Sequence, residues 1–348
     1  MTVLRRILWT LGLGTAAFLI AAFLIGYAAP FLSPLHFWWT DLFAVFLPPL
    51  SWIVGGIGLV LCAQGMYRGK WGRVVLAGGL LVLLVLRFAP RLAAWGPVSP
   101  STGTLEVMSL NVPASFNRHT ENTALAELVG KEGPDLLAFQ ESRIKTSQEA
   151  SRPTVARVSA SLRPLLDASM GYAPPRVLPA DSEIQQPVLG GIPLDSMSLH
   201  PLPPDGAKNA RSRYTRTQFT WQGRLAVLYN VHLHSVGQVR PWETMSEGKF
   251  SYTRWTAFLR AYREGALRRA QQARLIRRRI ERERHPVIVA GDFNSTPHQW
   301  AYRHIAQGLQ SAGSRGVRGW TATFPAQQPL VRIDHVLAGP AWGVVTAR

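Results

Sequence analysis

The sequence has almost no cysteine and few acidic residues. Its one cysteine, Cys62, excludes an internal disulfide and a cysteine metal cluster. The chain of 348 residues carries 20 Asp and Glu against 38 Lys and Arg, and a single acid, Asp41, lies in the first 95 residues. The resulting net charge of +18 suits nucleic acid, anionic lipid headgroups or phosphorylated substrates, and does not choose among them.

Charge is also missing from long apolar runs near the N-terminus. Residues 7–29 and 42–63 are each uncharged and long enough to cross a bilayer core of about 30 Å at about 1.5 Å per residue. A third span is predicted at 71–89, and it reaches full length if Arg73 and Arg87 extend outward. A cleaved signal peptide is the alternative for the first run, and a re-entrant or interfacial segment for the third.

The distribution of basic residues between these runs predicts an orientation. Arg5 and Arg6 precede the first run, residues 30–41 contain no Lys or Arg, and the second connection is basic. The positive-inside rule then places the N-terminus in the cytoplasm and everything after the third span on the outer face of the membrane. Arg87 and Arg91 count against this orientation.

After the apolar region, residues 96–104 (GPVSPSTGT) have the composition of a linker, and residues 105–348 have the pattern of an α/β domain. Strand-like runs alternate with helical segments predicted at about 120–131 and 254–284. The runs YTRTQFTW and RLAVLYNVHLHS read as a hairpin joined at QG. No internal repeat is present.

Polar residues stand at the ends of four predicted strands and within a fifth, where burial without a partner is costly. Taken singly, each is more typical of a cap, a surface position or a structural histidine. The set is Asn111, Glu141, His232, His234, Asp292, Asn294, Asp334 and His335.

Several of these residues together suit hydrolysis of a phosphate ester or anhydride. Two carboxylates, best Glu141 and Asp334, with an amide oxygen make a hard oxygen site of the kind that Mg²⁺ prefers, with Mn²⁺ as the alternative. Asp292 is placed to accept a proton from water, and Asn294, two residues later, is predicted on the same face of an extended strand. The nearby histidines, His232 and His335, would stabilise the phosphoryl oxygens.

In this order and spacing the residues resemble the endonuclease/exonuclease/phosphatase superfamily. The matching landmarks are Asn111, the Gln140–Glu141 pair, NVHL at 230–233, GDFN at 291–294, and Asp334 with His335. The resemblance covers about residues 104–348. It implies a four-layer α/β sandwich, two mixed sheets face to face with helices outside, and Mg²⁺-dependent hydrolysis of a phosphorus ester or anhydride.

The resemblance also assigns roles. It implies Glu141 as the principal metal ligand, helped by Asn111 and Asp334. The other roles are water positioning by Asp292 and Asn294, and phosphate stabilisation by His232 and His335, with His234 as a lesser candidate. One feature departs from the family's nucleases: no Asp or Glu lies between Asp292 and Asp334, so the role of the acid that orients His335 is vacant or filled from elsewhere in the chain.

The apolar N-terminus narrows the resemblance to membrane-anchored bacterial members such as the VanJ-like proteins, which suggests undecaprenyl pyrophosphate as substrate and the bilayer as partner. A surface nuclease is the alternative within this fold, and a catalytically inactive binding module on a membrane stem is the alternative outside it. The arginine-rich segment 254–284 admits a solvated helix, attraction to anionic lipid, or, least favoured, a nucleic-acid track.

Overall fold

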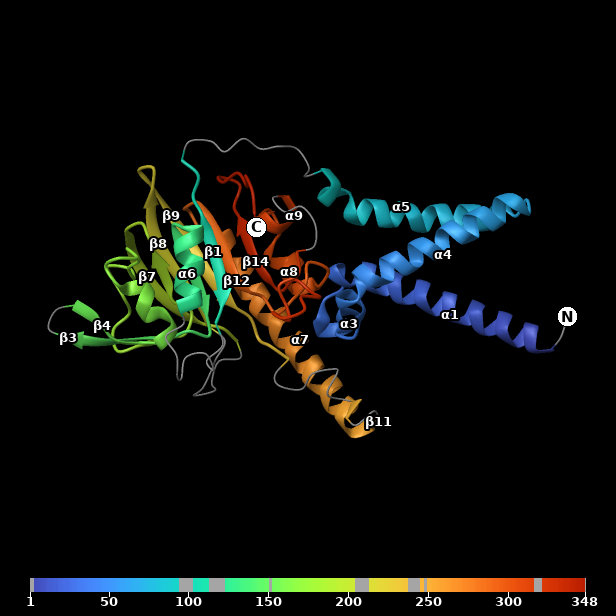
Figure 1. The fold of residues 1–348 in the computed structure, drawn as a ribbon, viewed down its shortest axis with the longest axis horizontal. Coiled ribbons are helices and arrows are strands. Elements are labelled where there is room, and N and C mark those ends of the chain that lie inside the picture. The colour runs from blue at the N-terminus through green and yellow to red at the C-terminus, as the bar shows by residue number, and fades with distance from the viewer. Residues whose placement is uncertain are drawn as a thin grey trace. The chain divides into compact units, whose positions relative to one another are not determined.

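The structure is a computed structural model (Figure 1) that describes residues 3–93, 103–112, 123–149, 152–203, 213–236, 245–246, 249–315 and 321–347. The chain divides into two compact units. Unit 1 comprises Met1–Gly96 and Thr296–Arg303, and unit 2 comprises Pro97–Ser295 and His304–Arg348. The linker predicted at 96–104 lies outside the described residues except for its last two positions.

Unit 1 is built from apolar helices. They are α1 (Val3–Ala28), η1 (Ala29–Phe31), α2 (Pro34–Phe37), α3 (Thr40–Val45), α4 (Leu47–Tyr67) and α5 (Trp71–Ala93). Their shared core consists of Phe23, Leu47, Val54 and Leu80. Three helical segments are long and apolar enough to cross a membrane by length and composition: Arg6–Phe31, Leu47–Tyr67 and Trp71–Phe88.

The second of these helices begins later than the sequence predicts. The uncharged run starts at 42, but α3 ends at Val45 and a new helix begins at Leu47. Pro48 and Pro49 explain the shift, because proline lacks the N–H that a helix interior requires and is tolerated in the first turn. The apolar run is therefore interrupted, and the long helix runs from Leu47 to Tyr67.

The segment Thr296–Arg303 is attached to the helices within unit 1. Arg87 Nη2 lies 3.0 Å from His298 Nδ1, and the Gln299 side-chain amide donates to Asp41 Oδ2 at 3.5 Å. The only acid of the apolar region is thereby buried against a polar partner, as a carboxylate in such surroundings requires.

Unit 2 contains the predicted α/β domain. Its helices are α6 (Thr123–Glu132), η3 (Ala160–Leu166), α7 (Tyr252–Glu281), α8 (Trp300–Ile305), which straddles the unit boundary, and α9 (Ala312–Arg315). Its strands are β1 (Val107–Asn111), β2 (Leu136–Gln140), β3 (Ile144–Glu149), β4 (Arg152–Val158), β5 (Glu183–Ile184), β6 (Val188–Gly190), β7 (Leu194–Pro201), β8 (Arg213–Trp221), β9 (Arg224–His232), β10 (Met245–Ser246), β11 (Lys249–Phe250), β12 (Val287–Asp292), β13 (Gln310–Ser311) and β14 (Asp334–Ala338).

Two mixed sheets form the centre of this unit. One has the order β1-β2-β6 and the other β13-β14-β12-β9-β8-β7. Apolar side chains from both, such as Phe139 of β2 with Leu228 of β9 and Ile288 of β12, belong to one buried core. Helix α6 adds Val129 to that core, and α7 lies along the larger sheet (Figure 1). The four-layer α/β sandwich is confirmed.

The predicted hairpin is also confirmed. Strands β8 and β9 pair antiparallel from Tyr214 and Val231 to Trp221 and Arg224. Gln222 and Gly223 connect them, with φ of 48° and 74°. Positive φ at both central residues is the turn geometry that matches strand twist.

Candidate active site

The ends of four strands meet at one edge of the two sheets. β1 pairs parallel with β2, and β9 pairs parallel with β12, so the carboxyl ends within each pair point the same way. The final residues of these strands are Asn111, Gln140, His232 and Asp292. Residues that lie up to 181 positions apart in the chain are thereby brought into hydrogen-bonding distance.

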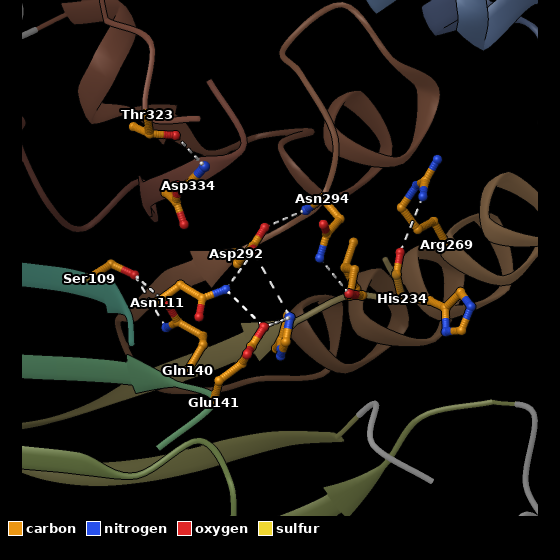
Figure 2. A network of polar contacts seen from close by, with 12 residues as sticks. Ser109, Asn111, Gln140, Glu141, His234, Arg269, Asp292, Asn294, Thr323 and Asp334 are labelled. Atoms are coloured by element: carbon orange, nitrogen blue, oxygen red, sulfur yellow. Dashed lines mark hydrogen bonds and ion pairs between the residues drawn. The ribbon is translucent and has the colours of Figure 1, made fainter. Parts of the chain in front are cut away.

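The Asn111 amide is the centre of the polar cluster (Figure 2). Its Nδ2 donates to Asp292 Oδ2 at 2.9 Å and approaches Glu141 Oε1 at 3.4 Å. His232 Nε2 lies 3.9 Å from an oxygen of each of the same two carboxylates. The structure thus brings four predicted site residues together.

The GDFN loop fixes the Asp292 carboxylate from the other side. The Asn294 backbone N–H donates to Asp292 Oδ1 at 2.7 Å, and the Asn294 Nδ2 donates to the Leu233 carbonyl at 2.9 Å. The prediction that both residues lie on one face of an extended strand is wrong, because β12 ends at Asp292 and Asn294 has a φ of 46°. The chain turns there, and that turn aims the N–H back at the carboxylate. Phe293, between Asp292 and Asn294, is completely buried.

Gly291 makes the parallel pairing of β12 and β9 possible at this point. Its φ is 138°, and a Cβ at this position would lie 1.9 Å from the Val231 carbonyl oxygen. A side chain is excluded both by this contact and by the backbone conformation. The glycine therefore permits Asp292 to stand directly opposite His232 in the register.

A buried amide pair connects the two sheets behind the cluster. Gln140 Nε2 donates to Asn230 Oδ1 at 2.7 Å, and Asn230 Nδ2 donates to the Phe139 carbonyl at 2.8 Å. Both side chains are completely buried. Glu141 follows directly in a left-handed conformation with a φ of 58°, so the Gln140 anchor sets the direction in which its carboxylate leaves the strand.

Asp334 faces the cluster from β14, opposite Asp292 in the register. The Thr323 hydroxyl accepts the backbone N–H groups of Ile333 and Asp334 at 3.1 and 3.3 Å and fixes the start of the strand. Among the described residues, the buried Asp334 Oδ1 has no hydrogen-bond partner.

His335 is not brought into the cluster by its described contacts. Successive strand residues face opposite sides, so His335 points away from the side that Asp334 faces. Its Nε2 lies 2.8 Å from the Ser295 carbonyl, and its ring packs edge-to-face on Phe293 at 5.1 Å. The Ser295 carbonyl thus holds the His335 imidazole. The sequence between Asp292 and Asp334 contains no acid that could do so. The catalytic role of His335 stays a prediction.

Burial dominates the electrostatics of the site. It raises the pKa of Asp292 to about 6, opposed by the hydrogen bonds from Asn294 and Asn111. It raises the pKa of Asp334 to about 7, and the Asp292 charge adds to this. Burial also lowers the pKa of His232, opposed by the Glu141 and Asp334 charges. Burial in the cluster therefore favours the neutral form of the His232 imidazole and the protonated form of the Asp292 and Asp334 carboxyl groups.

The donor atoms suit a hard divalent cation. Asn111 Oδ1 and Asp334 Oδ1 are buried oxygens without hydrogen-bond partners among the described residues, and carboxylate and amide oxygens are the ligands that Mg²⁺ prefers. Within the same residues, no three His, Cys, Asp or Glu side chains converge closely enough to hold an ion alone. A metal here would therefore depend on the Asn111 amide and on water.

Two contributions escaped the sequence analysis. The bridge between Gln140 and Asn230 lies inside the recognised motifs, where one amide ends an apolar strand and the other stands two residues before the end of another. Arg269 of α7, 1% exposed, donates to the His234 carbonyl at 3.2 Å. The sequence feature that could have identified Arg269 is its position on the apolar face of a helix that is otherwise basic. Within the described part of the chain, the His234 side chain forms no hydrogen bond or ion pair with the cluster.

Comparisons with known proteins show what the chain is similar to. A family model described as the Endonuclease/Exonuclease/phosphatase family matches residues 108–348. The human Nocturnin catalytic domain with bound sulfate is 17% identical, covering 72% of this chain and 87% of that one, with a TM-score of 0.42.

Two bacterial structures are similar to the same extent. Sphingomyelinase C from Streptomyces griseocarneus is 16% identical over 72% of this chain and 86% of its own, with a TM-score of 0.43. A Bacteroides thetaiotaomicron mannosyl-6-phosphatase is 16% identical over 68% and 86%, also with a TM-score of 0.43. No protein of curated function matches the sequence significantly.

Proposed function

The chain belongs to the endonuclease/exonuclease/phosphatase family, and from this premise we propose that it is a membrane-anchored, Mg²⁺-dependent hydrolase of a lipid-linked phosphate ester or anhydride. The observation that carries the proposal is the cluster in which the Asn111 amide joins Asp292 and Glu141 at the meeting edge of two sheets. The metal would be held by Glu141, Asn111 and Asp334.

A metal held by these residues would polarise the phosphoryl oxygens and offset negative charge that develops in the transition state. Asp292 takes a proton from the attacking water, because its carboxylate is fixed on one oxygen by the Asn294 N–H and on the other by the Asn111 amide. Since the Asn294 Nδ2 is engaged with the Leu233 carbonyl, its side-chain oxygen remains to orient that water.

His232 acts on the phosphoryl group as a hydrogen-bond donor. Burial lowers the pKa of His232 and so favours the neutral imidazole, which still carries one N–H to donate. The His232 Nε2 lies 3.9 Å from the Glu141 and Asp292 carboxylates, close enough for a group bound at the cluster to reach it.

Undecaprenyl pyrophosphate is the substrate we favour. Support comes from three helices long and apolar enough to span a bilayer, since a polyprenyl tail stays in the membrane while its diphosphate projects into water. With the catalytic unit on the outer face, such an enzyme would not have to extract the lipid. The preference for an extracytoplasmic location rests on the basic residues beside the spans.

The outer face of α7 supports an anionic membrane partner. Arg254 and Arg279 are exposed elsewhere on α7, whereas four exposed arginines of the helix and the arginine at its C-cap lie on the side opposite the buried residues: Arg260, Arg263, Arg274, Arg278 and Arg282. Each such residue near an anionic bilayer contributes roughly 1 kcal/mol of attraction. The same charges would attract nucleic acid, so the substrate test includes DNA.

The test measures phosphate release from undecaprenyl pyrophosphate by the full-length protein in lipid nanodiscs, with plasmid DNA assayed in parallel. We expect release with Mg²⁺, loss with EDTA, and at least a 10³-fold loss in Glu141→Ala and Asp292→Ala, a size typical for removing essential catalytic groups. Glu281→Ala, an exposed acid paired with Arg277 on α7, is the matched control and should keep full activity.

Each result bears on a separate part of the proposal. Release that persists in EDTA or in either variant would contradict the mechanism. Cleavage of DNA without release from the lipid would contradict the substrate and favour the nuclease alternative. Inactivity on every phosphate ester and anhydride would favour a binding module.

A further inference from the structure

One face of α7 carries an arginine that is almost fully removed from solvent. Tyr262, Gly265, Arg269 and Gln272 follow one another at intervals of three and four residues, so they lie on one side of the helix. All four are buried, and Arg269 is the largest fully buried side chain of the described residues. Burying a guanidinium is costly unless its donors are used, which raises the question of what it holds.

The backbone that leaves β9 is held from two directions. On one side it meets the GDFN loop: the Leu233 N–H donates to the Asp292 carbonyl at 2.9 Å, and the Leu233 carbonyl accepts from Asn294 Nδ2 at 2.9 Å. Leu233 directly follows His232, so these two contacts join the histidine's strand to the loop that carries the proposed base.

The other side of the same backbone is held by α7 (Figure 2). The His234 N–H donates to Gln272 Oε1 at 2.9 Å, and the His234 carbonyl accepts from Arg269 Nη1 at 3.2 Å. Every backbone hydrogen-bonding group of Leu233 and His234 therefore has a partner, two in the GDFN loop and two on the helix.

The helix is shaped for this contact. A Cβ at Gly265 would lie 3.1 Å from Arg269 Nη1 and 3.6 Å from the Ser235 carbonyl oxygen, so glycine provides the room in which the arginine reaches the strand. The Tyr262 ring lies under the guanidinium, 5.8 Å from ring centroid to Cζ. Gln272 uses its remaining amide group on the Pro203 carbonyl at 2.9 Å and is thereby fixed itself.

We propose that Arg269 and Gln272 are positioning residues that hold the Leu233–His234 backbone, and through it set His232 and Asn294 in their working geometry. The inference rests on the proposed function, because it concerns the same site. It gives the basic helix a role in turnover that differs from the role of its exposed arginines. The competing explanation is that both side chains only stabilise the packing of α7 on the sheet.

The experiment compares Gln272→Leu, Arg269→Met and Arg269→Lys with Arg216→Met in full-length protein. Arg216 is the matched control because its guanidinium bonds Glu283 at 2.8 Å, just beyond the end of α7, in a largely buried ion pair. Its loss destabilises the same helix and sheet without touching the Leu233–His234 backbone. Thermal unfolding, kcat and KM for phosphate release, and amide hydrogen exchange of residues 230–236 are measured for each variant.

We expect kcat to fall at least tenfold in Gln272→Leu and Arg269→Met, with KM changed less than twofold, and to recover partly in Arg269→Lys. Exchange of residues 230–236 should become faster in the first two variants. Arg216→Met should lower the unfolding temperature while kcat and this exchange stay as in the wild type. Gln272→Leu removes no charge, so it still tests the proposal if Arg269→Met does not fold.

Two results would overturn the proposal: wild-type exchange and kcat in Gln272→Leu, or a loss of kcat in Arg216→Met equal to that in Gln272→Leu at matched stability. The exchange measurement requires no substrate. Faster exchange in Gln272→Leu, in a protein that releases no phosphate from any substrate, would therefore contradict the proposed function while supporting the backbone contact.

Discussion

Gln140 and Asn230 share a hydrogen bond of 2.7 Å that joins the two sheets directly behind the polar cluster. Each amide comes from a different sheet and each is fully buried. Because Glu141 is the next residue after Gln140, the bond has consequences for both stability and activity.

Replacement of both amides should cost less than the sum of the two single replacements. Gln140→Leu or Asn230→Leu leaves one buried amide unsatisfied and should cost about 1–3 kcal/mol, whereas the double variant should cost less than the sum. Urea unfolding of the three variants provides the coupling energy. Ser109→Ala, which removes only the long contacts of 3.3 and 3.5 Å to Gln140, is the mild control, and strictly additive costs would contradict the coupling.

Activity should fall as pH falls. Burial raises the pKa of Asp292 to about 6, and a general base works only in its ionised form. A bound cation favours the carboxylate, so in Mg²⁺ the midpoint should lie at or below 6, with about a tenfold loss per pH unit beneath it. The measurement is kcat/KM for a soluble chromogenic phosphate ester between pH 4.5 and 8. A flat profile would contradict the role of Asp292.

The metal-free protein should be stabilised by removing the Asp334 charge. Burial raises the pKa of Asp334 to about 7, whereas an unfolded Asp titrates near about 4. Between these values the folded state binds more protons, so this carboxyl lowers stability as pH rises. Asp334→Asn should therefore be near neutral at pH 4.5 and stabilising by roughly 2 kcal/mol at pH 7.5 in EDTA.

Thermal unfolding of wild type and Asp334→Asn at both pH values measures this difference. Because the variant lacks a proposed ligand, Mg²⁺ should raise the unfolding temperature of the wild type more than that of the variant. An equal Mg²⁺ shift in both proteins would contradict the assignment of Asp334 to the metal.

The outer arginines of α7 should make activity sensitive to lipid charge. Replacing Arg260, Arg263 and Arg274 with Gln removes three exposed charges while the buried face of the helix is untouched. In nanodiscs containing phosphatidylglycerol, this variant should show a several-fold higher KM for a lipid diphosphate, and the difference should shrink in high salt. An equal KM at low salt would contradict a lipid-facing role.

The positions of the strands and helices in the catalytic unit could be predicted from the sequence better than the directions of their side chains. Strand ends could be found because apolar runs stop at polar residues such as Glu141 and Asp292. The direction of Asn294 could not, because a single residue with positive φ reverses the chain after the strand. For His335, two adjacent polar residues in one strand necessarily face opposite sides, and the motif alone does not reveal which side faces the cluster.

The role of α7 shows a similar limit. The charge of the segment identifies the helix as basic, but composition alone cannot distinguish a buried arginine from an exposed one. Arg269 differs from Arg260 only in its place relative to the apolar stripe, and its partner is a backbone carbonyl that has no signature in the sequence.

The start of the second long helix was predictable in principle, because two consecutive prolines fit its first turn.

The close approach at Gly291 also determines how this site can be altered. A Cβ added there would lie less than 2 Å from the Val231 carbonyl oxygen, so any other residue at this position would push β12 away from β9. The pairing of Asp292 opposite His232 in the strand register therefore depends on glycine at position 291. Redesign of this protein for another phosphate substrate would have to act through the loops around the pair, since the spacing of the pair itself is set by a residue that has no side chain to adjust.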